Sequence, residues 1–312
     1  MKVFGPVPSR RLGRSIGINN VPVKNCSYEC IYCQIGHTTN KHTNISEFYP
    51  PEDIKRYVEQ KVEDLKAKGE RIDYLSFVPD GDPTLDVNLG KIIDLIKPLG
   101  VKIAVITNSS QVYNKEIQAN LRKADLVSLK VDAVSENIWR TINRPCKELC
   151  LTEIKNGILD FAKTFKGKLI TETMLVDEIN DDTKEIKNIA NFILEINPYK
   201  SYISVPIRPP AIKWVRPISE SAINKAYQIF SRKGIQVEYL IGYEGNSFFS
   251  TGNIEEDILS ITAVHPMRKE AVEELLKKEN KDWTVVKKLV DIGKLNEVEF
   301  ESNNFFVRNY RK

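Results

Sequence analysis

The chain has 312 residues, of which 41% are apolar and 28% are charged, and its formal net charge is +4. This composition is typical of a globular protein with a hydrophobic core, and so small a net charge does not by itself predict binding to nucleic acid. No apolar run approaches the roughly 20 residues that span a bilayer, and no apolar stretch follows the charged N-terminus, so we expect neither a membrane span nor a signal peptide, and a cytoplasmic location.

Strands and helices alternate along the first 240 residues. Apolar runs predict strands at 15–19, 74–78, 102–106, 126–131, 169–175 and 202–206, and apolar residues at helical spacing predict helices at 51–68, 87–96, 115–122, 151–165 and 184–196. This alternation indicates about six parallel βαβ units with right-handed crossovers. Ligands of such sheets bind at the carboxyl ends of the strands, where polar residues gather in this sequence.

The alternation of predicted strands and helices ends after Glu238. Glycines at 242, 245 and 252 indicate a connecting segment, and three helices are predicted at 257–264, 268–278 and 283–291. Two strands, 294–301 and 304–310, form a hairpin, which completes the outline of a winged helix. We therefore expect two domains, residues 1–240 and 241–312. Residues 251–312 hold 11 Lys and Arg against 12 Asp and Glu, which argues against a duplex-binding face. A module for peptide, RNA, a partner subunit or dimerisation fits equally well.

Three of the five cysteines lie close together in the first domain. Cys26, Cys30 and Cys33 have the spacing C-x3-C-x2-C. Because the total of five cysteines is odd and three of them are clustered, we expect a reducing compartment and metal ligation rather than disulfides. Thiolates bind zinc and iron–sulfur clusters. Zinc would need a fourth ligand, for which His37 and His42 are nearby. A four-iron four-sulfur cluster would keep one iron free to bind a small molecule.

This stretch, with Tyr32 just before the last cysteine, resembles the signature of the radical S-adenosylmethionine (SAM) superfamily. The resemblance covers roughly residues 1–210 and implies a partial (β/α)6 barrel of the TIM type. It implies that Cys26, Cys30 and Cys33 hold a 4Fe-4S cluster whose open iron binds SAM, with Tyr32 beside the adenine. An electron donor such as flavodoxin or ferredoxin would reduce the cluster. SAM would then be cleaved to methionine and a 5′-deoxyadenosyl radical that abstracts hydrogen from a substrate.

The turn after the second strand, Asp80-Gly81-Asp82-Pro83-Thr84-Leu85, resembles the glycine-rich turn of the same family, although Asp82 stands where glutamate is usual. The resemblance implies that Asp80, Gly81, Asp82 and Pro83 bind the SAM amino group. An amine offers only donors, so acceptors are needed there, and glycine lets the backbone approach closely. The alternative is an ordinary Pro/Gly/Asp turn after a strand.

Ser128, Lys130 and Asp132 alternate along an otherwise apolar strand and therefore share one face. A lysine in the core of a βαβ domain is costly unless an anion meets it. Ser128 and Lys130 match the family position that holds the SAM carboxylate or ribose, and Asn108 is a further candidate for that role. The alternative for Lys130 is a salt bridge to Asp132 or Asp125.

Charged residues near the same edge of the sheet are candidates for contact with substrate. Glu172 lies on the fifth strand and Arg208 follows the sixth, and residues 1–45 hold six Lys and Arg against one acid, Glu29. The basic residues chosen from this segment are Arg10, Arg11 and Arg14. Their charge suits an anionic substrate, phosphate or RNA included, or an acidic electron donor. Alternatively, it balances the cluster and the SAM carboxylate or lies on a solvated surface.

We expect Cys146 and Cys150 to be structural cysteines, because a free cysteine packs as a small apolar residue. The alternative is that the two bind a second iron–sulfur cluster. Within the superfamily, residues 127–133 and 142–145 resemble proteins related to the tRNA wyosine-pathway synthase. We therefore expect a radical SAM enzyme whose substrate the sequence does not name. The alternatives are tRNA base modification of the wyosine type, modification of a peptide or protein, and an iron–sulfur sensor without enzymatic activity.

Overall fold

The computed structural model describes residues 2–241, 248, 250 and 252–309. Its main sheet contains β1 (Val3–Ser9), β2 (Gly13–Ile18), β5 (Tyr74–Phe77), β6 (Lys102–Thr107), β7 (Leu126–Lys130), β8 (Lys168–Met174), β9 (Lys200–Ser204) and β10 (Val237–Leu240). The spatial order follows this sequence order, β1 pairs antiparallel with β2, and every other pair is parallel. The described residues thus form seven parallel strands, one more than the sequence predicted.

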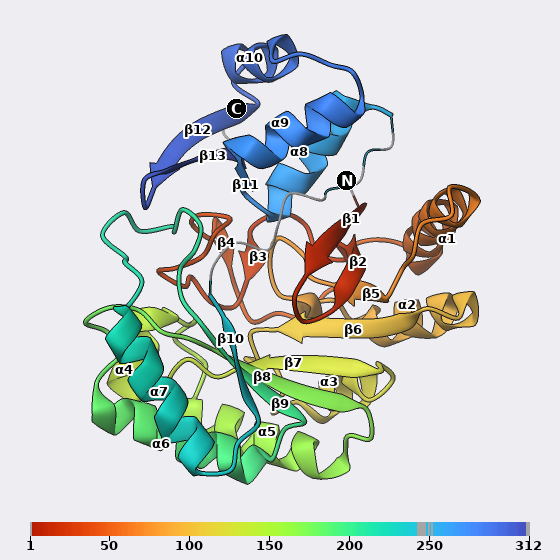
Figure 1. Ribbon diagram of the computed structural model, residues 1–312. Coiled ribbons are helices and arrows are strands. Elements are labelled where there is room, and N and C mark those ends of the chain that lie inside the picture. Colours follow the sequence, from red (N-terminus) through yellow and green to blue (C-terminus); the bar gives the residue numbers. More distant parts are fainter. Residues whose placement is uncertain (1, 242–247, 249, 251, 310–312) are drawn as a thin grey trace.

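Helices connect these strands and cover the outer face of the sheet (Figure 1). They are α1 (Pro51–Ala67), α2 (Leu89–Ile96), α3 (Lys115–Leu121), α4 (Glu136–Ile142), α5 (Leu151–Thr164), α6 (Thr183–Ile196) and α7 (Glu220–Arg232). Helix α1 begins at a proline, buries Ile54, Val58, Val62 and Leu65, and ends before Gly69, as its sequence predicts. The sequence prediction did not include α4, α7 or β10.

The inner face of the sheet is apolar at one end and polar at the other. Leu12, Ala104, Leu126, Ile170, Tyr202 and Leu240 form a buried cluster separate from the core beneath the helices. Leu12 belongs to the turn between β1 and β2, and the other five lie on β6 to β10, so the sheet curls around this turn as a partial barrel. Two residues further along, β7 and β8 place Ser128 and Glu172 on this face.

The C-terminal unit has its own buried core, which also receives Val7 of β1. It contains α8 (Ile254–Val264), β11 (Met267–Arg268), α9 (Lys269–Lys278), α10 (Thr284–Asp291), β12 (Leu295–Phe300) and β13 (Asn303–Arg308), with strand order β11-β13-β12. Three helices and a hairpin therefore lie where the sequence predicts them. That this unit is a winged helix remains a prediction. The predicted connecting glycines at 242 and 245 lie outside the described residues.

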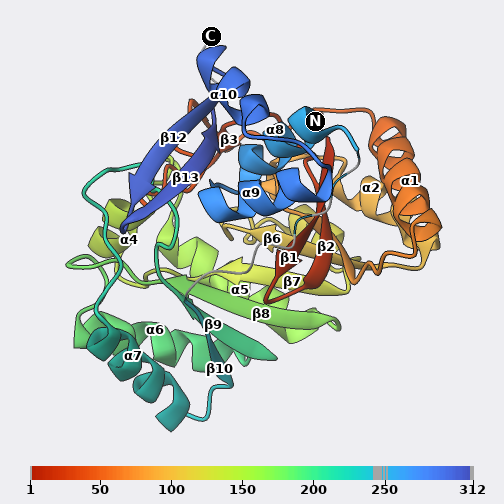
Figure 2. The same ribbon diagram turned by 45° about the horizontal axis from the view of Figure 1, so that its top comes forward.

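The C-terminal unit lies over β1 and over β3 (Asn25–Cys26) and β4 (Asn40–Lys41), the short strands of the cysteine segment (Figures 1 and 2). In the part of the chain that the structure describes, no helix combines the length and apolarity required to cross a bilayer.

Candidate functional site

The cysteine loop follows β2 and is held by backbone hydrogen bonds from distant segments. Its Ile31 N–H donates to Ile142 O at 3.0 Å, at the end of α4, and Ser27 O accepts from Cys146 N–H at 2.9 Å. From the other side, Ile212 N–H donates to Ile31 O at 3.1 Å. Segments distant in the sequence therefore hold the loop in place, in addition to its own turns at Cys33 and Gly36.

Amide side chains point at two of the sulfur atoms. Asn108 Nδ2 donates to Cys26 Sγ and Asn143 Nδ2 donates to Cys30 Sγ, each at 3.4 Å. Such donors stabilise sulfur that carries negative charge, as in a metal thiolate. Asn143 belongs to the segment 142–145 that resembles the family, and its sequence alone predicts no role for it. Its position at the end of α4 brings it to the loop, a contact that no local pattern shows.

Burial raises the pKa of all three thiols. The pKa of Cys26 lies well above its usual value because of burial and then the charge of Asp82, and the pKa of Cys30 is about 12 because of burial and Asp132. Burial also raises the pKa of Cys33, which the charge of Lys24 opposes. The thiols are therefore protonated unless a metal displaces their protons, which coordination does.

The chemistry of this donor set fits a 4Fe-4S cluster with three protein ligands. In addition to burial, the charges of Cys30 and Cys33 raise the pKa of Cys26, and the charge of Cys33 raises the pKa of Cys30, so the three thiols lie near one another. Within the described residues, no three His, Cys, Asp or Glu side chains are grouped closely enough to hold a single metal ion. His37 contacts Glu29, and His42 contacts Asn25, so neither completes a zinc site there.

The turn at residues 80–83 forms one wall of the site and depends on Asp82 and Gly81. The Asp82 carboxylate caps a short 3₁₀ helix (Pro83–Leu85) and accepts hydrogen bonds from Thr107 Oγ1 at 2.9 Å and Asn108 N–H at 2.6 Å. A Cβ on Gly81 would lie 1.8 Å from Asn25 O, so only glycine fits. Asp82 thus holds Asn108 beside the cysteines, and its predicted contact with SAM stays a prediction.

On the inner face of the sheet, Lys130 pairs with Glu172. Lys130 Nζ lies 2.7 Å from Glu172 Oε1, Ser204 Oγ donates to the same oxygen at 3.1 Å, and Arg11 Nη1 donates to Oε2. The suggested partners Asp125 and Asp132 were wrong, because Glu172 occupies the position beside Lys130 on the neighbouring strand.

Electrostatics at this pair favour the charged forms. Although burial opposes it, the charges of Arg11 and Lys130 hold the pKa of Glu172 at about 2. Burial lowers the pKa of Lys130, but Glu172 and Asp132 outweigh it and raise that pKa. The three side chains therefore form a buried, fully ionised group.

Asp132 positions Tyr32. Its carboxylate accepts hydrogen bonds from the Tyr32 hydroxyl, from Asn143 Nδ2 at 2.8 Å and from Met174 N–H at 2.8 Å. Lys130 Nζ lies 5.1 Å from the centre of the Tyr32 ring. The ring is thus fixed at the cavity wall, between the cysteine loop and β7.

These elements surround one cavity of about 290 Å³ inside the barrel. The predicted site residues that line it are Arg11, Tyr32, Cys33, Gly81, Asp82, Asn108, Ser128, Lys130, Glu172 and Arg208. Cys26 contacts this lining through Asn108, whereas Cys30 contacts Asn143, which lines a small neighbouring pocket. The structure thus brings most of the predicted site residues together.

Two of the predicted basic residues lie elsewhere. Arg14 starts β2 at the amino ends of the parallel strands, where its Nη2 lies 2.5 Å from Glu70 Oε2 and its N–H donates to Asp73. Arg10 donates to Ile241 O at 2.5 Å. Of the three N-terminal arginines proposed as substrate contacts, only Arg11 therefore lines the cavity, because the β1–β2 turn sends the side chains of Arg11 and Arg14 in different directions.

Arg208 connects the cysteine loop to the C-terminal unit. Its Nη1 donates to Gln34 Oε1 at 2.8 Å and its Nη2 lies 3.0 Å from His265 Nε2. Arginine only donates, so His265 Nε2 accepts and the ring proton is on Nδ1. Burial, and then the charge of Arg208, hold the pKa of His265 well below its usual value. The sequence analysis did not identify His265.

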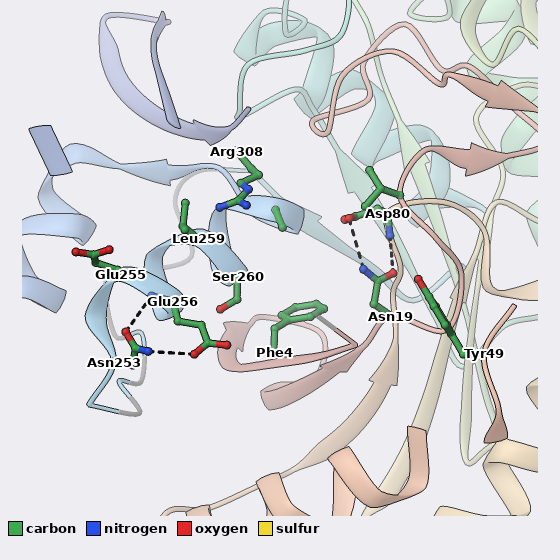
Figure 3. A pocket seen from close by; sticks show the side chains of 12 residues that line it. Phe4, Asn19, Tyr49, Asp80, Asn253, Glu255, Glu256, Leu259, Ser260 and Arg308 are labelled. Atoms are coloured by element: carbon green, nitrogen blue, oxygen red, sulfur yellow. Dashed lines mark hydrogen bonds between the residues drawn. The ribbon is translucent and has the colours of Figure 1, made fainter. Parts of the chain in front are cut away.

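A second pocket, of about 430 Å³, lies behind the 80–83 turn, between α8 and the barrel (Figure 3). Asp80 faces this pocket and contacts Asn19 through two hydrogen bonds. Glu256 and Ser260 of α8 and Arg308 line the opposite side. Asp80 and Pro83 are therefore outside the lining of the barrel cavity, although they belong to the same turn as Gly81.

Comparison with known proteins gives a consistent result. A family model described as the Radical SAM superfamily matches residues 20–193. The UPF0026 protein MJ1312 of Methanocaldococcus jannaschii is 46% identical over 310 residues, which cover 99% of this chain and 96% of that protein. The crystal structure of SuiB from Streptococcus suis is 12% identical with a TM-score of 0.54, covering 76% of this chain and 54% of SuiB. A radical SAM methyltransferase from Sphaerobacter thermophilus is 14% identical with a TM-score of 0.52, covering 73% of this chain and 67% of that one. Both structures share the barrel fold.

Proposed function

We propose that this chain, which belongs to the radical SAM superfamily and to the UPF0026 proteins, cleaves SAM reductively and uses the resulting 5′-deoxyadenosyl radical to abstract hydrogen from a substrate. The observation that carries the proposal is the convergence of the cysteine loop, the glycine turn and Lys130 on one cavity. The cluster, when bound, supplies the electron for cleavage and an iron open to SAM.

The residues of this chain hold and orient the reactants. Cys26, Cys30 and Cys33 hold the cluster, and Asn108 and Asn143 donate to two of the sulfurs. Gly81 has no side chain and lines the cavity, so its carbonyl group is suited to accept from the SAM amine.

The opposite wall supplies groups for the rest of SAM. Lys130 offers an ammonium for the SAM carboxylate, and Ser128 on the same face offers a hydroxyl for carboxylate or ribose. Tyr32, fixed by Asp132, forms a flat surface for the adenine. A cavity that holds SAM and substrate side by side is a need of an enzyme and not of an iron–sulfur sensor.

We also propose a division into domains, an electron donor and a cellular location. We divide the chain into a barrel domain, 1–240, and a winged-helix-like domain, 241–312, whose His265 contacts the barrel through Arg208. A flavodoxin or ferredoxin is the proposed electron donor. Free thiols at Cys146 and Cys150 and an oxygen-sensitive cluster both need a reducing compartment, so we propose a cytoplasmic location.

The test is anaerobic reconstitution with iron and sulfide, followed by dithionite and SAM, with 5′-deoxyadenosine measured by mass spectrometry. Cys30→Ala should lose the product, whereas Cys146→Ala, a substitution of the same size outside the ligand set, should keep it. Absence of product from wild-type protein that carries an intact cluster, with and without cell extract as a source of substrate, would contradict the proposal.

A further inference from the structure

Arg11, Lys130 and Glu172 form a group of charged side chains in the lining of the barrel cavity. The proposed cleavage of SAM gives a role only to Lys130. Arg11 reaches the cavity from the turn between β1 and β2, where the neighbouring Leu12 fills the apolar end of the barrel. Lys130 and Glu172 reach it from β7 and β8. The side chains of Arg11 and Glu172 are only 18% and 10% exposed, so the group is held inside the protein.

The spare hydrogen-bonding capacity of this group consists of donors. Both oxygens of Glu172 already accept, one from Lys130 and Ser204 and the other from Arg11. Lys130 has three N–H groups, of which Glu172 takes one. Arg11 has five, and its buried Nε has no hydrogen-bond partner among the described residues. Arg11 and Lys130 both line the cavity, so a ligand there must bring acceptors to bond to their remaining N–H groups.

The charge of Arg11 favours one kind of acceptor. A guanidinium is always charged, and charge-assisted hydrogen bonds to an oxyanion are stronger than those to a neutral acceptor. An oxyanion therefore suits Arg11 better than a neutral group, because it carries negative charge and only accepts hydrogen bonds.

We propose that the substrate carries a carboxylate or phosphate group that binds to Arg11, with Glu172 holding the guanidinium in place. The inference rests on the proposed function, in which Lys130 binds the carboxylate of SAM and leaves Arg11 for the substrate. Arg11 is then the residue that selects substrates by charge, and SAM and the substrate anion bind side by side.

A purely structural role for Arg11 would be to neutralise Glu172. Arg11→Lys separates the two roles, because lysine keeps the charge beside Glu172 but has no Nε–H and no planar pair of donors. Arg11→Met removes the charge as well. Arg14→Lys and Arg14→Met are matched controls from the same hairpin, since Arg14 pairs with Glu70 outside the cavity.

The experiment measures anion-dependent thermal stabilisation of the reconstituted protein, with SAM present. The probes are sodium phosphate and sodium malonate, each compared with sodium chloride at equal ionic strength. We expect both probes, or one of them, to raise the melting temperature of the wild type and of the Arg14 variants. For Arg11→Lys, the concentration that gives half of the effect should be at least about tenfold higher, because a charge-assisted bond is lost. Malonate acting at lower concentration than phosphate would identify a carboxylate, and the reverse order a phosphate ester.

Equal stabilisation of wild type and Arg11→Lys would overturn the proposal, and so would the absence of any effect on the wild type beyond that of chloride. Formation of 5′-deoxyadenosine with dithionite is measured on the same preparations. The Arg14 variants should form it like the wild type, because Arg14 pairs with Glu70 outside the cavity. Failure of the wild type to form it would count against the proposed function, whereas loss of the anion effect alone counts against the role of Arg11.

Discussion

Replacement of Glu172 by glutamine is the sharpest stability test of the buried ion group. The substitution keeps the size of the side chain and removes its charge, which takes from Arg11 and Lys130 the counter-ion that they share. Breaking a buried ion pair by removing one partner is strongly destabilising, because the remaining charge is uncompensated.

The magnitude follows from the ionisation of Glu172. Its pKa of about 2, compared with 4.5 for an ordinary glutamate, corresponds to about 3 kcal/mol of stability at about 1.4 kcal/mol per pKa unit. Because the pKa is depressed in the folded state, this contribution is fully present above pH 4.5 and is lost as the pH falls towards 2. Glu172→Gln should therefore cost about 3 kcal/mol at pH 7 and less than half of that at pH 3.

The assay is urea unfolding of wild type and variant at both pH values. Glu70→Gln is the control, because Glu70 pairs with Arg14 at the surface, where ion pairs contribute about 1 kcal/mol or less. A cost below about 1 kcal/mol for Glu172→Gln at pH 7, or a difference from wild type as large at pH 3 as at pH 7, would refute the reasoning.

Asp132→Asn removes the charged acceptor of the Tyr32 hydroxyl and should weaken SAM binding about tenfold in equilibrium dialysis with labelled SAM; unchanged affinity would show that Tyr32 needs no such support. Gly81→Ala would place a methyl group 1.8 Å from the backbone oxygen of Asn25, so the turn should shift and the iron content after reconstitution should fall; full iron content would contradict this. Cys150→Ser should retain all iron and sulfide, because Cys150 is exposed and outside the cysteine loop, and a loss would reveal a second cluster.

The sequence predicted the elements whose pattern is local. Helix α1 is an example, because its large apolar residues recur at helical spacing and all but the exposed Tyr57 become buried. The shared face of Ser128 and Lys130 is another, because it follows from the alternation of a strand. The missed helix α7 also has a local signal, since Ser219 caps it and Gly234 follows its end.

The partners of charged residues could not be predicted in this way. Lys130 and Glu172 are adjacent only because β7 and β8 pair in a particular register, which nothing in either strand's own sequence specifies. Arg11 and Arg14 are three residues apart, yet one enters the barrel and the other reaches Glu70, because the turn with Gly13 at a φ of +68° redirects the chain between them. The contact of Arg208 with His265 depends on how the C-terminal unit packs on the barrel.

The most direct test of the central claim is the electron paramagnetic resonance spectrum of the reconstituted, dithionite-reduced protein, recorded with and without SAM. If Cys26, Cys30 and Cys33 hold a 4Fe-4S cluster whose fourth iron binds SAM, the reduced protein should give a cluster signal whose shape changes when SAM is added, and Cys33→Ala should lose that signal. A signal that SAM leaves unchanged, or a protein that takes up zinc instead of iron, would contradict the account.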